Sequence, residues 1–154
     1  MEKGPGVAPF IFCLICHQNR YLKPGLYKFL PGIAWFITTV ILLTLPANKF
    51  PEDNIFKIPQ QDKIIHVILF FLLVYLFARP LKSSGFNSLQ KKSWFIRIAF
   101  YGLAYGIIIE FIQKYFVPNR DYDAWDILAD GVGCLAAYLY SLRFFLTGKS
   151  AVKK

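Results

Sequence analysis

Three pairs of polar residues sit inside apolar stretches of the chain at spacings that could assemble a chemical site. The members of each pair are three or four residues apart, so they would share one face of an α-helix. Carboxylate, imidazole and amide groups on such faces could bind a polar ligand, exchange protons as general acid and base, or hold a metal ion. The pairs are Asp62 with His66, Glu110 with Gln113, and Asp126 with Asp130, and Arg120 lies between the last two pairs.

Glu110 is the member whose position most strongly suggests a function. The twelve residues before it carry no charge. Because an ionised carboxylate in hydrocarbon costs at least about 2.5 kcal/mol, we expect Glu110 to face protein partners or a water-filled pocket. Gly102 and Gly106 precede it on the same helical ridge, and a second ridge of small residues includes Gly133. Packing these two ridges together would bring Glu110 close to Asp126.

Each of these residues also has a purely structural interpretation. Asp62, Asp123 and Asp126 could be helix N-caps or first-turn acids favoured by the helix dipole. Arg120 could only pair with these acids, and His66 could be a hydrogen-bonded packing residue. One histidine among carboxylates is a weak zinc pattern and suits Mg²⁺, Mn²⁺ or Ca²⁺ better. We expect no bound metal ion and no cofactor.

Four charge-poor runs must position the polar pairs. The first is nineteen residues long, and the others can cross about 30 Å of hydrocarbon once their polar flanks are included. The chain is 56% hydrophobic and 18% charged, which excludes a disordered chain and argues against a soluble enzyme. The sequence predicts an all-α polytopic membrane protein with four transmembrane helices in an up-down bundle. The runs cover 29–47, 64–78, 94–117 and 125–146.

Prolines separate the runs and predict where the helices end. Pro46 and Pro51 end the first run, Arg79-Pro80 together with Ser83-Ser84-Gly85 is expected to end the second, and Pro118-Asn119 turns the third into the fourth. Since successive helices then run in opposite directions, the three polar pairs should all lie at one end of the bundle.

The basic residues predict how this bundle is oriented. Thirteen of the 18 Lys and Arg residues lie before the first run, between the second and third, or after the fourth. All but one of the acidic residues lie on the opposite side. The positive-inside rule therefore places both termini in the cytoplasm and the polar pairs on the outer side. The net charge of +9 suits anionic lipid headgroups, and we expect the bilayer, and no nucleic acid, as a partner.

The order and spacing of these residues resemble the VanZ-like family of bacterial integral membrane proteins, across about residues 29–146. Two positions depart from the family pattern: Asn119 stands where Gly is common, and Asp130 stands where Asn is common. The second departure adds a negative charge and puts an amide-specific role in doubt. The resemblance is carried by Trp35 with Leu45-Pro46, Asp62-Lys63 with His66, Glu110 with Gln113, Phe116-Val117-Pro118-Asn119-Arg120, and Asp126, Asp130 and Gly133.

The resemblance implies a cell-envelope protein in the bacterial cytoplasmic membrane, since the family is named after an accessory protein of teicoplanin resistance. We expect the outer polar pocket to bind a lipid-linked or glycopeptide-like ligand and to contribute to antibiotic resistance. One alternative is an intramembrane enzyme that uses Glu110, His66 and Asp126. Another is a small oligomeric transporter with Glu110 as proton carrier. No established catalytic motif is present, so catalytic residues and enzymatic activity are left open.

The chain divides into three parts around this domain. Residues 1–25 are expected to be an extension that is interfacial or not native, 26–148 the transmembrane domain, and 149–154 a basic tail. Cys13, Cys16 and His17 fit a haem-attachment pattern, but a cytoplasmic location disfavours haem. Cys134 is expected to be a small packing residue.

Overall fold

The computed structural model describes residues 25–45, 61–118 and 122–146, and these residues are helical apart from short turns. Within these ranges no strand occurs. The predicted all-α architecture is therefore confirmed for the described residues. The elements are the 3-10 helix η1 (Leu26–Phe29) and the α-helices α2 (Leu30–Thr44), α3 (Gln61–Lys82), α4 (Ser88–Phe116) and α5 (Ala124–Phe145).

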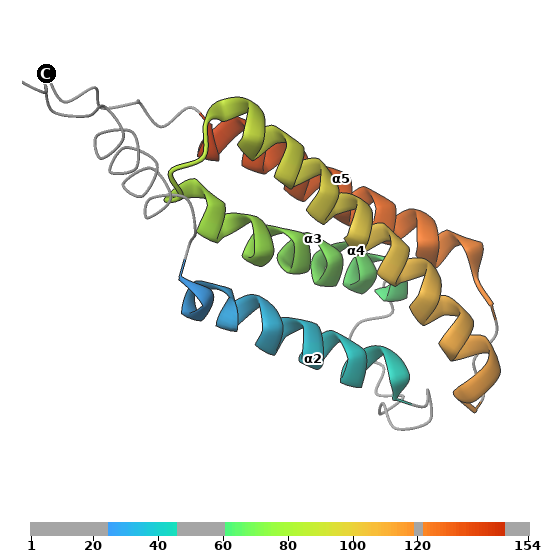
Figure 1. Cartoon of the computed structure of the whole chain (residues 1–154). Coiled ribbons are helices and arrows are strands. Elements are labelled where there is room, and N and C mark those ends of the chain that lie inside the picture. The colour runs from blue at the N-terminus through green and yellow to red at the C-terminus, as the bar shows by residue number, and fades with distance from the viewer. Residues whose placement is uncertain (1–24, 46–60, 119–121, 147–154) are drawn as a thin grey trace, which may run out of the picture.

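Four helical segments of this part of the chain are long and apolar enough to cross a membrane. Consecutive helices run in opposite directions (Figure 1). Large apolar side chains such as Ile37, Phe100 and Leu139 face outwards, whereas several polar side chains are buried between the helices. This distribution suits a lipid environment, in which polar side chains find hydrogen-bond partners only in the interior of the helix bundle. The direction in which the helices would cross the membrane, with both termini in the cytoplasm, stays a prediction.

The helices do not contribute equally to the bundle. α3 lies between α2 and α5, and α4 crosses the other three (Figure 1). α2 packs against α3 and α4, and three side-chain hydrogen bonds connect it to these two helices. Trp35 Nε1 donates to the Leu69 carbonyl at 3.1 Å, and Thr39 Oγ1 lies 3.3 Å from the Tyr105 hydroxyl. The third bond, from Gln113, belongs to the polar end of the bundle.

Glycines set the distances between the other helices. A Cβ atom on Gly133 would lie 2.5 Å from the Val67 carbonyl oxygen, so α5 approaches α3 through its backbone. A Cβ on Gly102 would lie 2.9 Å from Val74 and 3.0 Å from Cys134. The predicted ridge-to-ridge packing is therefore wrong for Gly133, which faces α3. The reason is that α3 and α5 form the most extensive contact of the bundle, and Gly133 gives it room.

The prolines end two of the helices as expected and fail to end one. Leu45 and Val117 take extended conformations before Pro46 and Pro118, which is what a following proline ring imposes. Pro80 lies inside α3, which continues to Lys82. A proline in the last turn of a helix removes only one backbone hydrogen bond, and few residues follow it that the helix must still accommodate. The helix therefore ends within the predicted break, at the turn of Ser83-Ser84-Gly85 and not at Pro80 itself.

α4 begins earlier than its apolar run suggested. Asn87 and Gln90 form a capping box, in which each side chain binds the backbone N–H of the other residue. The helix is therefore 29 residues long, or about 43 Å at 1.5 Å per residue, and exceeds the hydrocarbon thickness of a bilayer. A tilted path or an interfacial end accommodates the excess.

Candidate functional site

A buried His66–Asp130 pair joins α3 to α5 one turn inside the end of the bundle where α3 and α5 begin. His66 Nδ1 lies 2.9 Å from Asp130 Oδ1, and both side chains are fully buried. Gly106 of α4 makes room for this carboxylate, because a Cβ there would lie 2.5 Å from Asp130 Oδ2. The ring of Phe70 lies nearly parallel to the imidazole, with the two ring centroids 6.3 Å apart. The pair is therefore held by all three inner helices.

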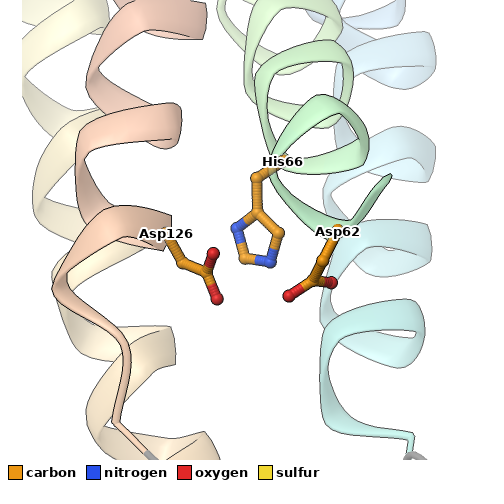
Figure 2. Close-up of side chains that lie close together, drawn as sticks. All are labelled: Asp62, His66 and Asp126. Atoms are coloured by element: carbon orange, nitrogen blue, oxygen red, sulfur yellow. The ribbon is translucent and has the colours of Figure 1, made fainter. Parts of the chain in front are cut away.

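Two further carboxyl groups flank the imidazole. Figure 2 shows Asp62 and Asp126 on either side of the imidazole. Asp62 lies one turn before His66 on α3, and Asp126 lies one turn before Asp130 on α5. One potential ligand atom from each of Asp62, His66 and Asp126 lies within 4.8 Å of the other two. Asp62 is exposed, whereas Asp126 is almost completely buried. Asp62 therefore marks the side from which this part of the bundle is reached.

Lys63 is a site residue that the sequence analysis did not single out. Its ammonium group lies 2.6 Å from Asp123 Oδ2 and 3.2 Å from Asp126 Oδ1. The hydrogen bond from Lys63 holds the pKa of Asp123 below its usual value. Asp123 also caps α5, since its Oδ1 accepts from the Trp125 backbone N–H. The available signal was spacing, because Lys63 precedes His66 by three residues and so shares its helix face.

Glu110 connects the end of α4 to the start of α5 through the backbone. Its Oε1 accepts a 2.7 Å hydrogen bond from the Asp123 N–H, and its side chain is 1% exposed. It lies within electrostatic range of His66, Asp126 and Asp130. The expected partner Arg120 falls outside the described residues, and in the part that is described Glu110 forms no ion pair.

Gln113 serves a different contact from the other predicted site residues. Its side-chain amide donates to the Leu43 carbonyl at 2.8 Å, in the last turn of α2. The carbonyls of a last turn have no partner within their own helix. Gln113 therefore supplies a hydrogen bond that α2 cannot make itself, and it attaches α2 to α4.

We refer to Asp62, Lys63, His66, Glu110, Asp123, Asp126 and Asp130 as the polar cluster. Three of its buried atoms have no hydrogen-bond partner among the described residues: His66 Nε2, Glu110 Oε2 and Asp130 Oδ2. Buried polar atoms in proteins are almost always partnered, so three orphans in one place call for a ligand, an ion or bound water. The cluster also holds five carboxyl groups against one lysine. Chemically, it can accept hydrogen bonds, relay protons or bind a cation.

Comparison with known proteins gives one distant relative. The chain is 30% identical over 87 residues to an uncharacterized protein of Schizosaccharomyces pombe, and the match covers 56% of this chain. It covers 50% of the yeast protein, so the chain spans about half the length of that relative. No family model matches, and no solved structure matches. The VanZ-like resemblance therefore stays a prediction.

Proposed function

We propose that the chain is a cell-envelope membrane protein whose polar cluster binds the headgroup of a lipid-linked or glycopeptide-like ligand. The observation that carries this proposal is the set of three buried, unpartnered polar atoms on three different helices. A purely structural cluster would pair these atoms within the protein, because an unsatisfied buried polar group costs about 1–3 kcal/mol. A ligand that enters beside the exposed Asp62 would supply the missing partners.

The chemistry of the orphan atoms indicates which groups the ligand must bring. Glu110 Oε2 and Asp130 Oδ2 accept hydrogen bonds when ionised, so hydroxyl or ammonium groups suit them. Sugars and amines of envelope glycolipids and glycopeptides carry such groups. The apolar outer surface of the four helices allows the lipid part of the ligand to stay in the bilayer.

Binding to the purified full-length chain in nanodiscs tests this proposal. We expect teicoplanin, or a lipid-linked cell-wall precursor placed in the disc, to bind the wild-type chain and to bind Glu110→Gln at least tenfold more weakly. The matched control is Lys114→Gln, which removes an exposed charge from the same end of α4. Equal affinity of all three proteins for each probe, or no binding at all, would contradict the proposal.

A second candidate function is an intramembrane enzyme that uses the same cluster. It is favoured by the His66–Asp130 pair, in which a carboxylate orients an imidazole whose other nitrogen has no partner. This is the arrangement of a general base held by an orienting group. Asp130→Asn would then lower turnover of a lipid-linked substrate and leave its binding nearly unchanged. The transporter alternative stays a prediction without an observation of its own.

The orientation and the membrane also belong to the proposal. We propose that both termini face the cytoplasm, and the charge distribution of the described helices supports it. A cysteine at exposed Ser83 should then be labelled from the cytoplasmic side, and one at Tyr122 from the outer side. The opposite pattern would reverse the topology. The bacterial cytoplasmic membrane rests on the VanZ-like resemblance alone, and the yeast relative gives it no support. Basic residues at the Ser83 end are Lys28, Arg79, Lys82, Lys91, Lys92, Arg97 and Arg143.

A further inference from the structure

We propose that Asp62, His66 and Asp126 form a binding site for a first-row divalent cation, Mn²⁺ or Zn²⁺. The inference concerns the protein's own side chains and does not depend on the identity of the ligand. One part of the inference rests on the proposed function: the cation would coordinate a phosphate oxygen of a lipid-linked ligand.

The geometry of the three side chains is close to that of a metal site. One donor atom from each residue lies within 4.8 Å of the other two. Metal–ligand bonds of about 2.0–2.2 Å place ligand atoms about 3 Å apart in adjacent positions and about 4.3 Å apart in opposite ones. Because the observed separations are at most 4.8 Å, the donor atoms need to approach one another by no more than about 2 Å to occupy adjacent positions. Asp62 is exposed and can make this adjustment by rotating its side chain.

The imidazole of His66 is oriented to bind a cation, a feature that a cluster of carboxyl groups alone would lack. An ionised Asp130 can only accept a hydrogen bond, so His66 then donates from Nδ1, and in the neutral imidazole Nε2 carries the lone pair. Nε2 is fully buried and has no partner in the described structure. The ring itself lies between the carboxyl groups of Asp62 and Asp126 (Figure 2). A metal-binding histidine is typically oriented by a carboxylate on its other nitrogen, and Asp130 supplies that contact.

A doubly protonated histidine does not explain this arrangement. An imidazolium would donate from Nε2, yet no carboxylate oxygen lies within hydrogen-bond reach of that atom among the described residues. The donor atoms of Asp62, His66 and Asp126 lie within 4.8 Å of one another, a spacing that an intervening ion would bridge. A cation bound at Nε2 requires the neutral imidazole, because only that form has a lone pair there.

The charges of the polar cluster favour a cation at the same place. Lys63 binds Asp126 Oδ1 and Asp123 Oδ2, and among the described residues no other cation binds Asp126 or Asp62. Gathered carboxylates in a poorly hydrated site repel one another, and a divalent ion offsets two of their charges. The sequence pattern alone favours Mg²⁺, Mn²⁺ or Ca²⁺ over Zn²⁺. The oriented imidazole with its unpartnered Nε2 shifts this preference to Mn²⁺ and Zn²⁺, because Ca²⁺ and Mg²⁺ prefer oxygen ligands alone.

Three protein ligands leave coordination positions for a further group. Metal sites of this kind bind water or a substrate oxygen in the open position. Five carboxyl groups would repel an anionic headgroup, so a phosphate could enter the polar cluster only beside a cation. A divalent ion on Asp62, His66 and Asp126 would therefore turn an anion-repelling end of the bundle into a phosphate-binding one.

Direct metal titration of the purified full-length chain in nanodiscs tests the site. After chelator treatment, MnCl₂ is added and free Mn²⁺ is followed by its electron paramagnetic resonance signal; Zn²⁺ is measured by elemental analysis. We expect one tightly bound ion per chain and at least tenfold weaker binding in Asp126→Asn and His66→Gln. Asp130→Asn should weaken binding by about 10–100-fold, because it removes only the orienting contact.

Lys114→Gln is the matched control, because it removes an exposed charge at the same end of the bundle and Lys114 lies outside the polar cluster. Its metal affinity should stay within about twofold of the wild type. If His66→Gln fails to fold, exposed Asp62→Asn still tests the site and should lose at least tenfold in affinity. Absence of Mn²⁺ and Zn²⁺ binding, or an equal loss in Lys114→Gln, would overturn the site.

Inorganic pyrophosphate separates the cation site from the proposed function. Labelled pyrophosphate should co-elute with the nanodisc-embedded chain only when Mn²⁺ is bound, and not with Asp126→Asn. Metal binding without pyrophosphate binding would leave the cation site standing and overturn its phosphate-binding role. Pyrophosphate binding that needs no metal would equally overturn that role.

Discussion

Gly106→Ala places a methyl group directly against the buried pair that organises the polar cluster. The added Cβ would lie 2.5 Å from Asp130 Oδ2, 3.0 Å from its Cβ and 3.1 Å from its Cγ. The Asp130 carboxylate is short and is held by His66 at 2.9 Å, so it cannot move away without weakening that bond. The substitution therefore forces either α4 away from α5 or the carboxylate away from the imidazole.

The expected magnitude follows from three contributions. Overpacking a filled interior costs about 1–3 kcal/mol. Replacing Gly by Ala inside a helix returns about 0.8–1 kcal/mol. Gly131→Ala measures the second contribution alone, because its Cβ would lie an ordinary 3.6 Å from Leu103. We expect Gly106→Ala to be about 1–3 kcal/mol less stable than Gly131→Ala, plus whatever is lost when the His66–Asp130 bond lengthens.

Reversible unfolding of the two variants in mixed micelles measures this difference. A double-mutant cycle with Asp130→Ala then identifies the contact, since removing the carboxylate should abolish most of the cost of Gly106→Ala. The reasoning is refuted if Gly106→Ala gains stability as Gly131→Ala does. It is also refuted if the cost of Gly106→Ala is unchanged when Asp130 has become Ala.

Three further predictions test other contacts. The Lys63 ion pair lowers the pKa of Asp123 in the folded protein. The stabilisation by this ion pair is therefore fully present above the pKa of Asp123 in the unfolded chain, about 3.9, and is lost as the pH falls through the lower pKa of the folded state. The difference in unfolding free energy between the wild type and Asp123→Asn, measured between pH 2 and 6, should shrink on acidification. Gln113→Ala leaves the Leu43 carbonyl without its donor and should cost about 1–3 kcal/mol, seen as faster hydrogen exchange in the last turn of α2. Gly133→Ala should cost about 3 kcal/mol or more, because its Cβ meets the backbone of α3, which cannot rotate away as a side chain can, and size-exclusion chromatography should show aggregated protein.

The local features of this protein follow from the sequence by itself. Charge-poor runs and their prolines predict four apolar helices, because chain length in a bilayer and the missing proline N–H act within each segment. Alternating direction places all the carboxyl groups of the polar pairs at one end of the bundle. Asp62 and His66 share a face for the same local reason. Within the predicted break after the second run, α3 continues past Pro80 and ends before Ser83-Ser84-Gly85, because a proline so close to a helix end costs too little to stop the helix.

The partners of each polar side chain were decided only by the tertiary structure. His66 binds Asp130 on α5 and not Asp62 on its own helix, and Lys63 provides the cation that was expected from Arg120. Gln113 binds α2, away from Glu110. Such choices depend on the rotation of each helix about its axis. In a soluble protein an apolar stripe reveals that rotation, but here the lipid-facing and buried faces are both apolar, so the sequence carries no such stripe. Backbone contact at Gly133 and packing at Gly106 set the rotation, and with it the composition of the polar cluster.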